Sequence, residues 1–188
     1  MPIIEIGNKV HIKPNKNWKW NFCQSKNRLT LDMGDDMIFV SAFEKRHLVN
    51  DAFNRAFISV EQSEDFTLFV EKLEQQLPVP DDFLYQIALN CLVAKSFYKP
   101  LMPKSWFFNQ VPMLSNALLS NVVKLQSSIE ERHYVIVESN LNASTLMLIE
   151  KSHNLNDVKA LNQFDLIKVM NDRLIPVNFQ SNQEVNAA

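Results

Sequence analysis

The sequence predicts an α+β protein, with strands and helices mixed in its first half and mostly strands in its second half. Three observations support this fold class. Residues 18–42 contain alternating apolar and polar side chains, and residues 63–98 place apolar side chains at helical spacing. Beyond residue 105, short apolar runs are separated by turns that contain Asn. The length of 188 residues fits one large domain or two small ones.

The first elements are predicted to be strands. Residues 18–23 and 28–33 each alternate apolar with polar side chains, and the turn at 25–27 between them predicts a hairpin. After a second turn at 34–36, residues 37–42 are apolar on both faces, which predicts a central strand. The aromatic side chains of the first run are expected to share one face of the sheet: Trp18, Trp20 and Phe22.

Two helices are predicted next. Ser63 is the expected N-cap of the first helix, which runs to Leu77 with apolar residues on one face. Pro78 and Pro80 end this helix and precede a second helix over residues 81–98. The second helix is apolar around much of its circumference, so we expect it to be buried.

The rest of the chain is expected to form a second domain. Prolines cluster after the second helix, so we place a boundary near residue 105. The predicted division is an extra N-terminal segment at 1–9, for which disorder is one expectation, an N-terminal domain at 10–104, a β-rich C-terminal domain at 105–180 and a polar tail at 181–188. Strands are predicted at 122–126, 133–138, 145–150, 158–161, 164–170 and 173–177, with a turn at Asn171-Asp172. Periodicity leaves 164–170 open between strand and helix.

Composition argues against several function classes. The chain has only two glycines, so no glycine-rich phosphate loop can be written. A net charge of −2 disfavours a bulk nucleic-acid binder, and no apolar run is long enough to span a membrane. Two cysteines without metal spacing indicate a reduced, cytoplasmic protein. We expect no cofactor and interpret Cys91 and His133 as structural residues, with an enzyme built from scattered residues as the third hypothesis.

Residues 97–108 form the stretch richest in candidate contact residues. Prolines stiffen it, and aromatic and methionine side chains accompany its two lysines, Lys99 and Lys104. One interpretation is a linker whose aromatics pack into both domains. The other is a preorganised surface for a partner with acidic and apolar groups. Composition alone does not separate the two interpretations.

Three segments together resemble one family: residues 12–20 (IKPNKNWKW), 98–106 (YKPLMPKSW) and 167–174 (IKVMNDRL). In order and spacing they are similar to the Z-ring-associated cell-division protein family ZapC, from about residue 10 to about residue 177. The combination of MPKSW and MNDRL in that order is the most specific part of the resemblance.

The resemblance implies a protein without catalytic activity that binds FtsZ, the tubulin-like GTPase of the division ring. Such a protein promotes lateral association (bundling) of FtsZ filaments, stabilises the Z ring and lowers FtsZ GTPase turnover, in the cytoplasm at midcell. The implied fold is an N-terminal α/β domain followed by a twisted, barrel-like β domain. We expect a monomer without nucleic-acid partners or membrane insertion, because two domains can offer two contact surfaces.

The resemblance also assigns FtsZ contacts to individual positions. The basic residues are Lys99, Lys104 and Arg173, and the apolar position is Leu31; Trp106, in the same segment as Lys104, is included with them. Leu31 has a competing interpretation as a core residue of the hairpin. The alternative function is a small peptide- or ligand-binding module that uses aromatic-lined pockets, formed by the Trp18 and Trp20 face or by the aromatics of 97–108.

Overall fold

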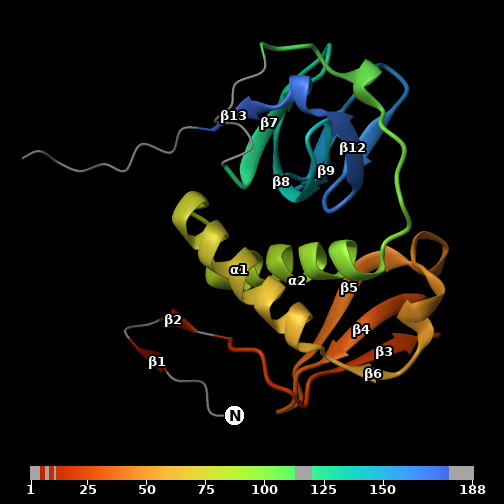
Figure 1. The fold of residues 1–188 in the computed structure, drawn as a ribbon, viewed down its shortest axis with the longest axis vertical. Coiled ribbons are helices and arrows are strands. Elements are labelled where there is room, and N and C mark those ends of the chain that lie inside the picture. The colour runs from red at the N-terminus through yellow and green to blue at the C-terminus, as the bar shows by residue number, and fades with distance from the viewer. Residues whose placement is uncertain (1–4, 7–8, 11, 113–119, 178–188) are drawn as a thin grey trace, which may run out of the picture.

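The computed structural model describes residues 5–6, 9–10, 12–112 and 120–177. It has a four-stranded sheet and a five-stranded sheet, with two helices between them (Figure 1). The predicted α+β class is therefore confirmed. Within the predicted segment at 1–9, β1 (Glu5–Ile6) pairs with β2 (Lys9–Val10); the rest of that segment and the tail at 181–188 lie outside the described residues.

The four-stranded sheet has the strand order β5-β4-β3-β6. Its strands are β3 (Lys19–Cys23), β4 (Arg28–Asp32), β5 (Ile38–Glu44) and β6 (Ala56–Phe57). The predicted hairpin is confirmed, with Trp20 opposite Leu31 and a turn residue, Asn27, at φ 52°. The predicted central strand is wrong, because β5 lies at the edge of the sheet. Its exposed and buried residues alternate, and Ile38 is 62% exposed on the outer face.

The two helices are α1 (Val60–Gln76) and α2 (Asp81–Phe97). The predicted N-cap at Ser63 is wrong, because the helix starts one turn earlier. The Ser59 side chain accepts a hydrogen bond from the Gln62 backbone N–H, and the Gln62 side chain accepts one from the Ser59 N–H. This reciprocal capping box satisfies two otherwise free donors. Helix α2 is buried along most of its length, as predicted.

The five-stranded sheet has the order β12-β9-β8-β7-β13 and does not close on itself, so the barrel-like description is a loose one. Its strands are β7 (Val122–Gln126), β8 (Glu131–Ser139), β9 (Ala143–Leu148), β12 (Leu166–Met170) and β13 (Ile175–Pro176). Periodicity left 164–170 open between strand and helix, and the pairing of β12 with β9 shows that residues 166–170 form a strand. A separate hairpin joins β10 (Ser152–Asn154) to β11 (Ala160–Asn162). Arg173 belongs to a short 3₁₀ turn, η5 (Asn171–Arg173), and not to the strand predicted at 173–177.

Buried apolar side chains form two cores. The first core combines the four-stranded sheet, both helices and the side of the five-stranded sheet that faces them; its members include Trp20, Leu31, Leu73, Leu92, Val122, Val135 and Met147. The second core lies on the other side of the five-stranded sheet; its members include Phe108, Leu125, Tyr134, Leu148, Leu161 and Leu174. The two halves of the chain therefore share one core, and the second half has another of its own.

A polar contact also joins the two halves. The Gln76 Oε1, at the end of α1, accepts hydrogen bonds from the N–H of Asn121 at 3.0 Å, the N–H of Val122 at 3.1 Å and the Ser120 hydroxyl at 3.3 Å. One side-chain oxygen thus fixes the chain as it enters β7.

Candidate functional site

Two of the three family-like segments lie side by side in the structure. Residues 103–105 run along the free edge of β12, where Pro103 and Lys168 form a parallel bridge. The Lys104 N–H donates to the Lys168 carbonyl at 2.8 Å, and the Met170 N–H donates to the Ser105 hydroxyl at 2.8 Å. Residues more than 60 positions apart in sequence thereby form one surface. We call it the junction surface and define it by Met102, Lys104, Trp106, Met170 and Arg173.

The junction surface exposes large apolar side chains. Met102 is 79% exposed, Trp106 is 72% exposed and Met170 is 39% exposed. Trp106 lies in the 3₁₀ turn η3 (Ser105–Phe107), and its ring is 5.6 Å from the ring of Phe107. The neighbouring Phe108 is buried in the second core, so the Trp106 backbone is anchored while its ring faces solvent. Exposed aromatic and methionine side chains on an anchored backbone are typical of a protein-binding surface.

The basic residues of the junction surface are not equivalent. Arg173 is only 18% exposed; its Nη1 lies 2.6 Å from the Asp172 carboxylate, and its Nε donates to the Ser105 carbonyl at 3.3 Å. Arg173 therefore holds η3 against η5, and its charge is partly neutralised. Lys104 is half-buried and has no carboxylate partner among the described residues, so its charge is available to a partner.

A buried polar network supports this end of the sheet. The Asn171 side chain accepts a hydrogen bond from the Ser144 hydroxyl at 2.7 Å and donates one to the Asn140 carbonyl at 2.8 Å. The turn at 140–142, which contains Asn140, also presents Leu141, which is 90% exposed. Sequence reasoning missed Leu141, since only the contact between the turn at 140–142 and Asn171 places it at the end of β12. A leucine between two asparagines in a predicted turn was the available signal.

Lys99 and Leu31 lie outside the junction surface. The exposed Lys99 ammonium donates to the Arg46 carbonyl at 2.8 Å, which places it against η1 (Lys45–His47) at the end of α2. Leu31 is 0% exposed in the first core, opposite Trp20 and Phe39. A partner cannot touch the Leu31 side chain in this conformation.

The two tryptophans on the aromatic face of the hairpin belong to the first core. Trp18 is 3% exposed and Trp20 is 1% exposed, and the Trp20 Nε1–H donates to Gln62 Oε1 at 3.0 Å. Both rings are therefore covered in this structure and offer almost no surface to a ligand. Of the aromatics considered for such a role, Trp106 is the one that the structure leaves mostly exposed.

The residues considered for catalysis have structural partners. His133 Nδ1 lies 2.8 Å from the Glu150 carboxylate near the surface. Cys91 is fully buried on α2, and burial raises the pKa of its thiol, which keeps it protonated and unreactive. Among the described residues, no group of three or more His, Cys, Asp and Glu is arranged to hold a metal ion.

The fold and the junction surface define the class: an α+β protein that exposes aromatic, methionine and basic side chains where the two halves of its chain meet. No helix in the described part of the chain is long and apolar enough to cross a membrane. The family model for the N-terminal part of the cell-division protein ZapC matches residues 11–99, and the model for its C-terminal part matches residues 100–180.

Curated relatives agree with the family models. The cell division protein ZapC of Ferrimonas balearica is 35% identical over 179 residues, 95% of this chain and 100% of the relative. The ZapC proteins of Shewanella woodyi and Pseudoalteromonas atlantica are 35% and 36% identical over 166 residues, which is 88% and 87% of this chain and 92% of each relative. The chain belongs to the ZapC family of cell-division proteins.

Proposed function

We propose that this protein binds FtsZ filaments, with the junction surface as one of its two contact surfaces, and promotes their lateral association. In this way it stabilises the Z ring and lowers FtsZ GTPase turnover, without catalysis of its own. It acts as a monomer in the cytoplasm, at the midcell division ring.

The observation that carries the proposal is the meeting of two family-like segments at one exposed surface. Lys104 and Trp106 come from the first segment, and Met170 and Arg173 come from the second. Each segment alone looks like a loop or strand end. Together they present apolar anchors beside a cation, the combination that central contact residues of protein interfaces favour.

The charges support a division of labour within the surface. FtsZ is acidic, so the free Lys104 ammonium steers the encounter, and rim charges of this kind act mainly on the association rate. Trp106, Met102 and Met170 supply apolar area that is buried on binding. Arg173 acts as a positioning residue, because it ties η3 to η5.

The two remaining residues have separate roles in the proposal. Lys99 adds positive charge at the end of α2, away from the apolar anchors. Leu31 influences FtsZ binding only through the stability of the first core, because its side chain is fully buried. Substitution of Leu31 should therefore lower the thermal midpoint together with any loss of binding.

Co-sedimentation with GTP-assembled FtsZ from the same organism tests the proposal, with light scattering and phosphate release followed in parallel. We expect the protein in the pellet, raised scattering and slower phosphate release. A folded protein that stays in the supernatant at low salt contradicts the proposal.

Three variants locate the contact. Trp106→Ala and Lys104→Asp should each reduce co-pelleting at least tenfold while the thermal midpoint stays nearly unchanged, because both side chains lie at the surface. Lys151→Asp is the matched control, since Lys151 is an exposed lysine at the start of the β10 hairpin. Equal losses in Lys104→Asp and Lys151→Asp, with no loss in Trp106→Ala, would show that net charge, and not this surface, decides the binding.

A further inference from the structure

The turn that joins β10 to β11 is anchored at both ends and exposed at its tip. Leu155 before the tip and Leu161 after it are buried in the second core. Between them, Val158 is 95% exposed, and Lys159 is exposed beside it. A lone exposed apolar side chain is normal on a protein surface, so its surroundings decide whether Val158 belongs to a contact.

Hydrogen bonds fix the backbone of this tip. The Asn156 Oδ1 accepts from the N–H of Val158 at 3.0 Å and from the N–H of Lys159 at 2.8 Å. The Lys159 carbonyl accepts from the N–H of Leu155 at 2.8 Å, which closes the turn. Valine is also stiff at its first side-chain torsion. Val158 is therefore held in place before a partner arrives, and ordering it on binding costs little conformational entropy.

The tip adjoins the junction surface through Phe107. The Lys159 Nζ lies 5.1 Å from the centre of the Phe107 ring, and the Phe107 ring lies 5.6 Å from the Trp106 ring. These contacts lead from Trp106, which is 72% exposed, through Phe107 to Lys159 and its neighbour Val158. Val158 is therefore not a lone exposed side chain, because the apolar anchors of the junction surface continue to it.

The charge of the tip matches that of the junction surface. Lys159 has no carboxylate partner among the described residues, and the same holds for Lys104. Asp157 is the one acid of the turn 155–159, so it lowers the positive charge of the two lysines without cancelling it. Apolar anchors beside an excess of positive charge fit a partner surface that is apolar and acidic.

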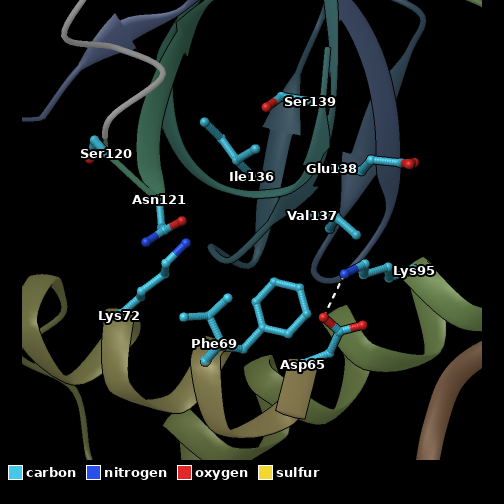
Figure 2. A pocket seen from close by; sticks show the side chains of 11 residues that line it. Asp65, Phe69, Lys72, Lys95, Ser120, Asn121, Ile136, Val137, Glu138 and Ser139 are labelled. Carbon is cyan, nitrogen blue, oxygen red and sulfur yellow. Dashed lines mark hydrogen bonds and ion pairs between the residues drawn. The ribbon is translucent and has the colours of Figure 1, made fainter. Parts of the chain in front are cut away.

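The helix side of the five-stranded sheet is arranged differently. Figure 2 shows Phe69 of α1 pointing towards the sheet, and both Phe69 and Val137 of β8 are buried. The Lys95 ammonium lies 2.5 Å from the Asp65 carboxylate, so its charge is compensated (Figure 2). The β10–β11 turn differs in both respects, since its valine is exposed and its lysine is unpaired.

We propose that the β10–β11 turn is part of the FtsZ-contact surface, with Val158 as an apolar anchor and Lys159 as the cation beside it. This inference rests on the FtsZ binding proposed above, and it extends the junction surface beyond the two family-like segments. The patch of FtsZ that it requires combines an apolar recess for Val158 with a carboxylate within reach of Lys159.

A pair of charge-matched variants tests the anchor. Val158→Asp places an acid against an acidic partner and should weaken co-pelleting with GTP-assembled FtsZ at least tenfold. Val60→Asp is the control, because Val60 is a 77% exposed valine at the start of α1 and its replacement changes the net charge equally. It should pellet as the unmodified chain does. Both variants should keep their thermal midpoint, since both side chains lie at the surface.

A milder variant tests the cation. Lys159→Gln should weaken binding by about threefold, mainly through slower association, and should reduce the dependence of binding on salt. Lys151→Gln removes an equal charge from the other end of the hairpin and is the control. Proximity is measured directly with the photo-cross-linking residue p-benzoylphenylalanine in place of Val158 or of Val60. Only the first chain should form a covalent adduct with FtsZ filaments on illumination.

The outcomes separate this inference from the proposed function. If the unmodified chain pellets with FtsZ while Val158→Asp pellets as well as Val60→Asp, the inference is overturned and FtsZ binding stands. If the unmodified, folded chain stays in the supernatant, the proposed function fails and the inference falls with it. A selective loss in Val158→Asp, together with an adduct from position 158 alone, supports the inference.

Discussion

The two sheets of this protein differ in how many of their faces are buried. The four-stranded sheet packs one face on the helices and leaves the other exposed, so Ile38 and Val40 of β5 lie in solvent while Phe39 is buried. The five-stranded sheet is buried on both faces: Val135 belongs to the first core and Tyr134, its neighbour in β8, belongs to the second. The second core exists only because segments outside the sheet cover its outer face.

This difference explains where the junction surface lies. The covering segments bury Phe108 and Leu174 in the second core, and the residues just before each of them, in η3 and η5, include Trp106 and Arg173. The same short turns therefore close a core and present a contact surface. None of the described residues covers the outer face of β5 in this way, and that strand presents alternating exposed residues in place of anchored turns.

The largest effect on stability is expected from a substitution in the segment that covers the second core. Phe108→Ala should lower the free energy of unfolding by about 3–5 kcal/mol, because a large buried ring leaves a cavity. Phe57→Ala is the matched control on β6, where the ring is 60% exposed, and it should change stability by less than about 0.5 kcal/mol. Urea unfolding followed by circular dichroism measures both. Equal effects would mean that the second core contributes little to stability.

The next effect concerns the contact between the two halves. Gln76→Ala removes the acceptor of two N–H groups and one hydroxyl. The Ser120 hydroxyl keeps the Val122 carbonyl at 2.7 Å and the Val122 N–H keeps the Ser120 hydroxyl at 3.3 Å, but the Asn121 N–H loses its acceptor. Leaving this partly buried donor without a partner should cost about 1–3 kcal/mol. Gln75→Ala, an exposed neighbour on α1, is the control and should be nearly neutral. Amide hydrogen exchange should also quicken at residues 120–122 in the Gln76 variant; unchanged exchange there would show that the contact is dispensable.

A third expectation is that the second core makes the protein sensitive to acid. His153 is 0% exposed; its Nδ1 lies 2.6 Å from the Tyr134 hydroxyl, and its Nε2 lies 3.0 Å from the Glu130 carbonyl. Burial lowers the pKa of His153 below its usual 6.5, although the Glu130 carbonyl and carboxylate, with Glu150, act in the opposite direction. The positive charge of Arg132 acts in the same direction as burial. The Phe108 ring, which carries no charge, also packs beside the imidazole.

The sign of the pH dependence follows from this shift. Below pH 6.5 the unfolded chain binds a proton at His153 that the folded chain does not bind until a lower pH, so stability falls as pH drops from 6.5 towards the folded pKa. Urea unfolding between pH 7.5 and pH 5 measures the slope, and NMR titration of the imidazole gives its folded pKa. A folded pKa above 6.5 would contradict the prediction.

Local signals in the sequence predicted most elements, and contacts distant in sequence decided the rest. The hairpin and α2 follow from side-chain periodicity within each segment. The edge position of β5 and the strand at β12 depend on pairing partners, which periodicity does not identify. The candidate site divides in the same way. Lys104, Trp106 and Arg173 were assigned from a family resemblance, whereas Leu141 joins them only through Asn171, and burial of Leu31 had to be seen in three dimensions.

The smallest expected effect lies in the half with the exposed sheet face and concerns the start of α1. Ser59→Ala should lower stability by about 1 kcal/mol, because the hydroxyl that accepts from the Gln62 N–H is lost. Ser63→Ala is the matched control: its hydroxyl only donates to the Ser59 carbonyl inside the helix, so its loss should be close to neutral. Thermal unfolding of the two variants compares them directly. Among the described residues, the hydrogen bonds of Ser59 all go to Gln62 and Ser63 of the same helix, so its effect should stay local, without the change at residues 120–122 expected for Gln76→Ala. A larger loss for Ser63→Ala than for Ser59→Ala would place the helix start one turn later than the structure does.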